Sequence, residues 1–226
     1  MRRKILLLCF LAFSTIVFAQ SSPSFGIRAG LSSAKMSGEA ANNLNDLLDF
    51  TNGGITTGNH TGFFGGGNVN IPLTPQFSIE PGLYYTQKGY ELRGELNVKG
   101  LDFLGANAKA KLTSNYIDLP VLLKGNFNGL QVFAGPQISY LAKADLRTTA
   151  GILGFNLLNK TMDATEQFNR WDAGVTGGVG YQFSNGLNIN AAYDHGLMRA
   201  DKNQNMNAYN RSFKVGLGIT FYKNIP

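Results

Sequence analysis

The residues of this sequence best suited to chemistry lie near its C-terminal end. His195 directly follows Asp194, and Ser212 lies in the next extended segment. A histidine that activates a serine hydroxyl, while a carboxylate orients the imidazole, is the arrangement used for ester and amide hydrolysis. Alternation along the two segments puts Ser212 on the wrong face to meet His195. A second histidine, His60, falls in a stretch expected to be a long loop.

Acidic residues gather at one other place, Asp46 and Asp49 in the stretch AANNLNDLLDF. The spacing of the apolar residues there favours a short amphipathic helix over a metal site. The sequence contains no HExxH, CxxC, phosphate-loop or EF-hand pattern. We therefore expect no metal site, no cofactor and no enzymatic activity.

The N-terminus has the pattern of an export signal. MRRKILLLCFLAFSTIVFAQ combines a basic start, an apolar run and small residues before a cleavage point. The run is shorter than the roughly 20 residues of a membrane-spanning helix. We expect residues 1–19 to be a cleaved signal peptide and residues 20–226 to form one domain. Cys9 would leave with the peptide, so the exported chain would contain no disulfide.

Charge excludes one class of partner. Removing the three basic residues of the signal peptide from the total of 20 leaves 17 against 14 acidic residues, a net charge of +3. This is too little for a nucleic-acid-binding surface, so no nucleic acid is expected. No stretch after residue 20 has the length of a membrane helix. A closed barrel is the remaining way to span a membrane.

Strands are indicated by composition and by alternation. The 28 glycines, 16 phenylalanines and 9 tyrosines suit twisted strands. Eight segments alternate apolar and polar residues: 25–32, 62–73, 77–89, 116–124, 130–141, 171–183, 187–194 and 212–222. Short turns (74–76, 126–129, 184–186) alternate with long connections (35–60, 89–114, 142–169, 197–209). This predicts an all-β fold, an eight-stranded antiparallel transmembrane barrel with short periplasmic turns and four long extracellular loops.

The polar faces of these segments carry charges that balance. Four cations, Arg28, Lys88, Lys124 and Lys214, oppose four anions, Glu80, Asp118, Asp172 and Asp194. A soluble barrel or sandwich also alternates, but its water-exposed surface has no need of such a balance. Inside a narrow barrel charges must pair, because an unpaired buried charge is costly. We expect these eight residues to form a polar network in the lumen, with Glu80 beside Lys124.

Two further patterns fit a barrel in the outer membrane. Aromatic residues fall near the short turns (Phe77, Phe127, Phe183, Phe221) and near the long loops (Tyr85, Tyr140, Trp171, Tyr193), as interfacial belts would. In the last segment Lys214, Gly216, Ile219 and Phe221 follow the pattern that barrel assembly machinery reads on a final strand. Five residues follow Phe221, which departs from the usual terminal aromatic.

Three segments carry a resemblance. YYTQKG (84–89), YIDLPVLLK (116–124) and VFAGPQISYL (132–141) resemble the PorT-like outer-membrane β-barrel family of Bacteroidota, and the likeness extends over the mature chain. The resemblance implies a barrel; the secretion role of one namesake member does not carry over with it.

Pro81, Pro120 and Pro136 lie within predicted strands, where proline removes a ladder hydrogen bond, so bulges or widened hydrogen-bond spacing are expected there.

The function expected from these observations is that of a small non-enzymatic barrel in the cell outer membrane. It would contact outer-membrane lipid and barrel assembly machinery, and it would act as a scaffold or bind a protein partner through its extracellular loops. Apolar loop residues favour such a partner, a plug or strands continuing above the membrane: Leu101, Phe103, Leu104, Ile152, Leu153, Phe155 and Leu157. Porin-like transport of small solutes is the alternative, although side chains fill so narrow a barrel. A lipid A modifying hydrolase that uses His195 is a further alternative.

Overall fold

The computed structural model describes residues 22–37, 55–96, 106–152, 155–202 and 208–221. The signal peptide, the stretch with Asp46 and Asp49, and four of the apolar loop residues (Leu101, Phe103, Leu104 and Leu153) lie outside the described residues. Within them, no helix is long and apolar enough to cross a membrane.

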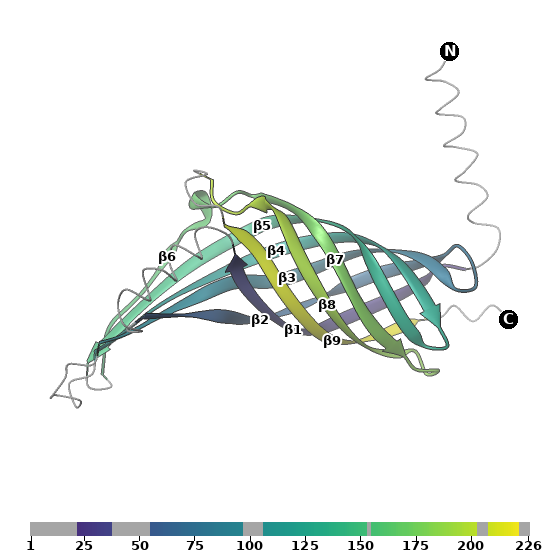
Figure 1. Ribbon diagram of the computed structural model, residues 1–226, viewed down its shortest axis with the longest axis horizontal. Coiled ribbons are helices and arrows are strands. Elements are labelled where there is room, and N and C mark those ends of the chain that lie inside the picture. Colours follow the sequence, from purple (N-terminus) through teal and green to yellow (C-terminus); the bar gives the residue numbers. More distant parts are fainter. Residues whose placement is uncertain (1–21, 38–54, 97–105, 153–154, 203–207, 222–226) are drawn as a thin grey trace, which may run out of the picture.

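Nine strands make up the described part of the chain: β1 (Ser24–Ser37), β2 (Ile55–Pro72), β3 (Phe77–Leu96), β4 (Ala106–Phe127), β5 (Leu130–Ile152), β6 (Phe155–Asp163), β7 (Trp171–Gln182), β8 (Leu187–Arg199) and β9 (Tyr209–Phe221). One turn of 3-10 helix, η2 (Thr165–Gln167), precedes β7. Eight strands close an antiparallel ring in the order β1–β2–β3–β4–β5–β7–β8–β9, and β9 pairs with β1. The predicted eight-stranded antiparallel barrel is therefore confirmed (Figure 1).

The short turns lie together at one end of the ring, where β1 also begins and β9 ends (Figure 1). The tightest turn joins β4 to β5 through Asn128 and Gly129, whose φ angles are 53° and 92°. Positive φ at both central residues is the two-residue hairpin geometry that matches strand twist, and asparagine followed by glycine favours it. Local sequence thus sets the register of this hairpin.

The two faces of the ring differ in polarity. Apolar side chains of the predicted outer face are exposed, including Phe25, Ile27, Leu83, Leu123 and Leu217. Aromatic side chains lie at both ends of this apolar band. Near the short turns Phe77 packs on Phe127, with 6.0 Å between ring centroids, and near the extracellular end Tyr140 packs on Trp171, with 5.0 Å between ring centroids. Phe77 and Tyr85 are separated by about 26 Å of strand. Allowing for strand tilt, that is close to the height of a barrel's lipid-facing band.

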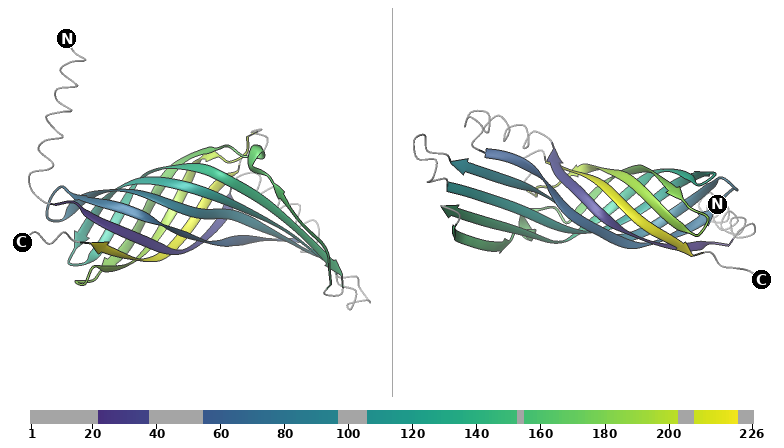
Figure 2. Two further views of the ribbon diagram at one scale, coloured as in Figure 1. Left: turned by 180° about the vertical axis from the view of Figure 1, so that it is seen from behind. Right: turned by 90° about the horizontal axis from the view of Figure 1, so that it is seen from below.

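Two of the four expected long loops are mostly strand. Residues 89–96 and 106–114, expected to be loop, continue β3 and β4, and residues 142–152 and 155–163 form the end of β5 and all of β6. With the start of β2 they make a sheet that projects beyond the ring (Figure 2), which we call the extension. His60, also expected in a loop, lies in β2 and is buried.

The extension reverses the polarity of the ring. Its outer face carries Lys109, Lys111 and Arg147, and Lys109 pairs with Glu91 at 2.7 Å. The face that continues the lumen carries Tyr90, Leu112, Leu146 and other apolar residues, which pack in a small core with Tyr116, Leu141, Ala144, Ala164 and Phe168. Alternation in the sequence was present but inverted. Strands selected by an apolar outer face therefore ended too early.

The segment after β6 fastens the extension to the rim. The Thr165 hydroxyl accepts a hydrogen bond from the Ala144 N–H at 3.0 Å, and the Ala164 N–H donates to the Ala144 carbonyl at 2.8 Å. Hydrogen bonds from the Thr165 side chain and N–H hold the pKa of Asp163 below its usual range. This turn therefore keeps its anionic acceptor down to acidic pH.

The prolines interrupt hydrogen bonding without a bulge. The β3–β4 ladder is broken between Pro81 and Tyr84, and the β4–β5 ladder between Pro120 and Leu123, yet the register is identical on both sides of each break. Of the two expected alternatives, the structure therefore shows an interrupted, more widely spaced ladder at these positions and no bulge. Gly135 allows the backbones of β4 and β5 to lie close together there, because a Cβ atom at this position would lie 2.0 Å from the Val121 carbonyl oxygen.

A closed ring with every strand paired to its neighbours should resist detergent. We expect the protein kept cold in dodecyl sulfate to migrate differently from the boiled protein, because a closed barrel has no free edge at which unfolding begins. Electrophoresis of paired cold and boiled samples measures this. Identical migration, together with recovery from the soluble periplasmic fraction, would contradict a membrane barrel.

Candidate functional site in the barrel interior

All eight predicted lumen charges lie inside the ring, with exposed fractions between 0% and 8%. They come from β1, β3, β4, β7, β8 and β9, and period-2 alternation turns each toward the axis. Ion pairs divide seven of them into two groups, and Asp172 lies beside the second group. One group, which we call the inner cluster, lies toward the short turns; the other, the outer cluster, lies toward the extension.

The inner cluster is centred on one carboxylate. Glu80 accepts two contacts from Arg28, Nη1 to Oε1 at 2.7 Å and Nη2 to Oε2 at 3.0 Å. Lys124 Nζ also contacts Glu80 Oε2. The expected pair of Glu80 and Lys124 is therefore present, and Arg28 shares the same anion. Removing the shared anion would leave two buried like charges together.

The outer cluster is a chain of alternating charges. Asp118 accepts from Lys88 at 3.0 Å on Oδ1 and lies 3.4 Å from Lys214 on Oδ2. Lys214 continues to Asp194 Oδ2 at 2.6 Å. The Thr176 hydroxyl lies 2.8 Å from Asp194 Oδ1. Each of the four charged groups thereby has a counter-charge, as a dry interior requires.

Apolar side chains fill the lumen beside both clusters: Phe64, Tyr84, Leu122 and Phe133. Lys214 Nζ lies 5.6 Å from the ring centroid of Phe64, and Arg28 Cζ lies 5.9 Å from that of Phe133. These rings need space on the facing strands. A Cβ on Gly216 would lie 2.6 Å from Phe64, and one on Gly178 would lie 2.6 Å from Phe133. The interior is packed rather than open.

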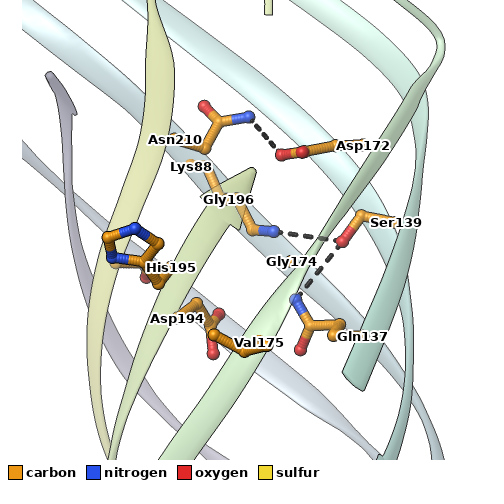
Figure 3. A pocket seen from close by; sticks show the side chains of 11 residues that line it. Lys88, Gln137, Ser139, Asp172, Gly174, Val175, Asp194, His195, Gly196 and Asn210 are labelled. Carbon is orange, nitrogen blue, oxygen red and sulfur yellow. Dashed lines mark hydrogen bonds between the residues drawn. The ribbon is translucent and has the colours of Figure 1, made fainter. Parts of the chain in front are cut away.

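Asp172 stands apart from the other charges. Its Oδ2 accepts from Asn210 Nδ2 at 2.9 Å, while Oδ1 has no hydrogen-bond partner (Figure 3). It forms no ion pair with any described residue. A small cavity lies beside it, lined also by Lys88, Asp194 and Ser212. Its interaction with Asn210, which the sequence did not single out, joins it to the Tyr116 hydroxyl at 3.2 Å.

The hydrolase arrangement is not assembled. His195 packs on Tyr193 at 6.2 Å between ring centroids, while Asp194 points to the lumen and binds Lys214. Ser212 is buried with no hydrogen-bond partner for its hydroxyl. Among the described residues, no group of three or more His, Cys, Asp and Glu side chains could hold a metal ion.

The four residues of the proposed assembly signal lie on β9 and divide by face. Lys214 and Gly216 are turned to the lumen, and Phe221 is exposed at the short-turn end. Gly216 faces Phe64 and Lys214 belongs to the outer cluster, so both have structural roles that are independent of assembly. The signal itself stays a prediction.

Several polar residues that complete the lumen were not among the eight residues of the predicted network: Tyr116, Gln137, Ser139, Thr176 and Asn210. Lys88 Nζ lies 3.3 Å from Ser139 Oγ and 4.7 Å from the ring centroid of Tyr116. All but Asn210 fall within alternating segments, so their places on the polar face of a strand were the available signal. A selection based on charge alone passed over them.

Comparison with known proteins shows the family to which the sequence belongs. Residues 18–202 match the family described as Outer membrane protein beta-barrel domain. Among solved structures, Neisserial surface protein A is 13% identical, with a TM-score of 0.46, covering 89% of this chain and 100% of that chain. Ail, the attachment invasion locus protein of Yersinia pestis, is 11% identical (TM-score 0.41, covering 89% and 100%). OprG from Pseudomonas aeruginosa is 14% identical (TM-score 0.38, covering 89% and 97%). No curated protein is significantly similar in sequence.

The shared anion predicts unequal effects on stability. Glu80→Gln should lower the free energy of unfolding by about 3–5 kcal/mol if the site is dry, because Arg28 and Lys124 lose their common partner. Lys124→Gln should cost less, since the paired contacts between Arg28 and Glu80 remain. The double variant should lose less than the sum of the single losses. Denaturant midpoints of refolded barrels measure all three.

Glu166→Gln is the matched control, because that carboxylate is exposed and its ion pairs contribute little. Strictly additive losses for Glu80→Gln and Lys124→Gln would show that the two side chains do not interact.

Proposed function

Because this chain belongs to the family of outer membrane protein β-barrel domains, we propose that it is a non-enzymatic outer-membrane protein that binds a protein partner through its extension. Within that family we assign it to the PorT-like group, on the three segments that resemble that group. The role would be that of a receptor or scaffold at the cell surface or in secretion machinery. The observation that carries the proposal is the sheet that stands beyond the rim.

The extension is built for contact with water and with another molecule. A strand needs only about 9–11 residues to cross a membrane, whereas β3, β4 and β5 contain 20, 22 and 23 residues. The additional length spans no lipid. It instead displays a charged outer face, with Lys109, Lys111 and Arg147, of a kind that lipid tails would exclude.

The opposite face of the extension is partly uncovered. Leu158 and Met162 on β6 are 47% and 43% exposed, although neither faces the lipid-facing band of the ring. Among the described strands β6 pairs only with β5, so its second edge has free N–H and carbonyl groups. Exposed apolar residues next to a free strand edge are features that protein partners use.

Transport and hydrolysis have less support. The ring interior holds two ionic clusters and four apolar side chains, which leaves no continuous channel among the described side chains. Asp194 and Ser212 face the lumen, whereas the His195 that a hydrolase would need lies on the opposite face of the barrel wall. Barrel proteins of this size commonly use side chains to fill the interior.

Site-specific photocrosslinking in cells tests the proposal. A photoreactive residue at Thr161 samples the outer face of the extension, one at Met162 samples the other face, and one at Leu123 is the matched lipid-facing control. We expect protein adducts, identified by mass spectrometry, at one or both extension positions and only lipid adducts at Leu123. Protein adducts at Leu123, with none at Thr161 or Met162, would place the partner on the barrel wall and overturn the proposal.

The packed interior also predicts electrical behaviour. Refolded barrels in planar bilayers should show no steady open level, because Lys88, Lys214 and their partners close the lumen. Single-channel recording measures this directly. A stable ion-selective conductance would favour transport over partner binding.

A further inference from the structure

The charges inside the ring balance as a whole but not in each cluster. The inner cluster has two cations, Arg28 and Lys124, and one anion, Glu80. The outer cluster and the neighbouring Asp172 together have two cations, Lys88 and Lys214, and three anions, Asp118, Asp172 and Asp194. The outer half of the lumen therefore carries one negative charge in excess, and the apolar side chains separate it from the inner excess of positive charge.

The excess is localised on Asp172. Asp118 and Asp194 both contact Lys214, and Asp118 also contacts Lys88. Asp172 forms no ion pair with a described residue and accepts hydrogen bonds from neutral groups, the Asn210 amide and the Met198 backbone N–H. Asp172 is 5% exposed, and its Oδ1 has no partner. A carboxylate oxygen buried without a counter-charge or donor is destabilising, so a bound group is expected to satisfy it.

A cavity lies where that group would bind. Asp172 and Ser212 both line it, and the Ser212 hydroxyl, like Asp172 Oδ1, has no hydrogen-bond partner. Figure 3 shows the cavity bordered by Asp172, Asp194, Lys88 and Gln137. The space open to the centre of a water molecule is about 10 Å³. This is room for one water-sized particle and excludes any organic solute.

We propose that this cavity binds a single alkali cation through Asp172 Oδ1 and Ser212 Oγ. The charge fits, since one monovalent cation cancels the excess of the outer half of the lumen. A divalent cation fits poorly, because Ca²⁺ takes six to eight oxygen ligands, and Asp118 and Asp194 are already engaged by lysines. The ion would complete the closure of the outer mouth of the lumen.

The test compares sodium with a cation too large for the cavity. Thermal unfolding of the refolded barrel is followed by circular dichroism in sodium chloride and in choline chloride at equal ionic strength, about 100 mM, with pH fixed near neutrality. We expect the wild-type midpoint to be about 3 °C higher in sodium, because a ligand bound only by the folded state stabilises it. Asp172→Asn should abolish this difference, and Ser212→Ala should reduce it.

Glu166→Gln is the control for loss of a carboxylate outside the site, and it should keep the full sodium effect. Equal wild-type midpoints in the two salts would overturn the proposal, as would a sodium effect that survives undiminished in both Asp172→Asn and Ser212→Ala. A wild-type midpoint that follows pH but not sodium would also overturn it, since Asp172 would then hold a proton. Ser212→Ala retains the charge of the site and keeps the test decisive if Asp172→Asn does not refold.

Discussion

The structure depends on one electrostatic constraint: a charge buried inside a narrow ring needs a counter-charge, which another strand must supply. Strands far apart in sequence are joined in this way, since Lys214 on β9 contacts Asp118 on β4, and Arg28 on β1 contacts Glu80 on β3. Each contact offsets part of the free-energy cost of removing two ions from water, but only when the two charged groups stay at ion-pair distance. The same contacts occupy the lumen, which is the reason for expecting that it does not conduct.

The extension follows from the same preference of charges for a polar environment, applied where the strands leave the membrane and enter water. Within the lipid-facing band, apolar side chains point outward and charges point inward; beyond the aromatic residues Tyr140 and Trp171 the faces exchange. Since an outward-facing lysine is unfavourable in lipid and favourable in water, the exchange marks the membrane boundary on β4 and β5. The residues beyond that boundary are those through which we propose that a partner binds.

Much of the ring could be predicted from the alternation of apolar and polar residues alone. Phe25 to Leu31 and Leu119 to Leu123 alternate so regularly that their lipid-facing side is fixed by the period of a strand. Strands continuing above the membrane were only one of three alternatives for the long loops, and the strands of the extension were not assigned. ANAKAKLTS alternates in the opposite sense, with lysines outward, whereas an apolar outer face was the criterion for a strand. Alternation also placed charges in the lumen, but it could not show that Glu80 serves two cations or that Asp172 serves none. Those contacts depend on the stagger of strands around the closed ring, which no local pattern specifies.

Chemical reactivity of the lysines tests the central claim most directly. An amine-reactive reagent applied to the folded barrel, with the sites of modification quantified by mass spectrometry, compares the lumen lysines with Lys160, which is exposed on β6. Lys88, Lys124 and Lys214 should react far more slowly than Lys160 in the folded state and equally fast after unfolding, because their amines are buried against carboxylates. Reaction of Lys88 or Lys214 at the rate of Lys160 in the folded barrel would show an open, hydrated lumen and contradict the account.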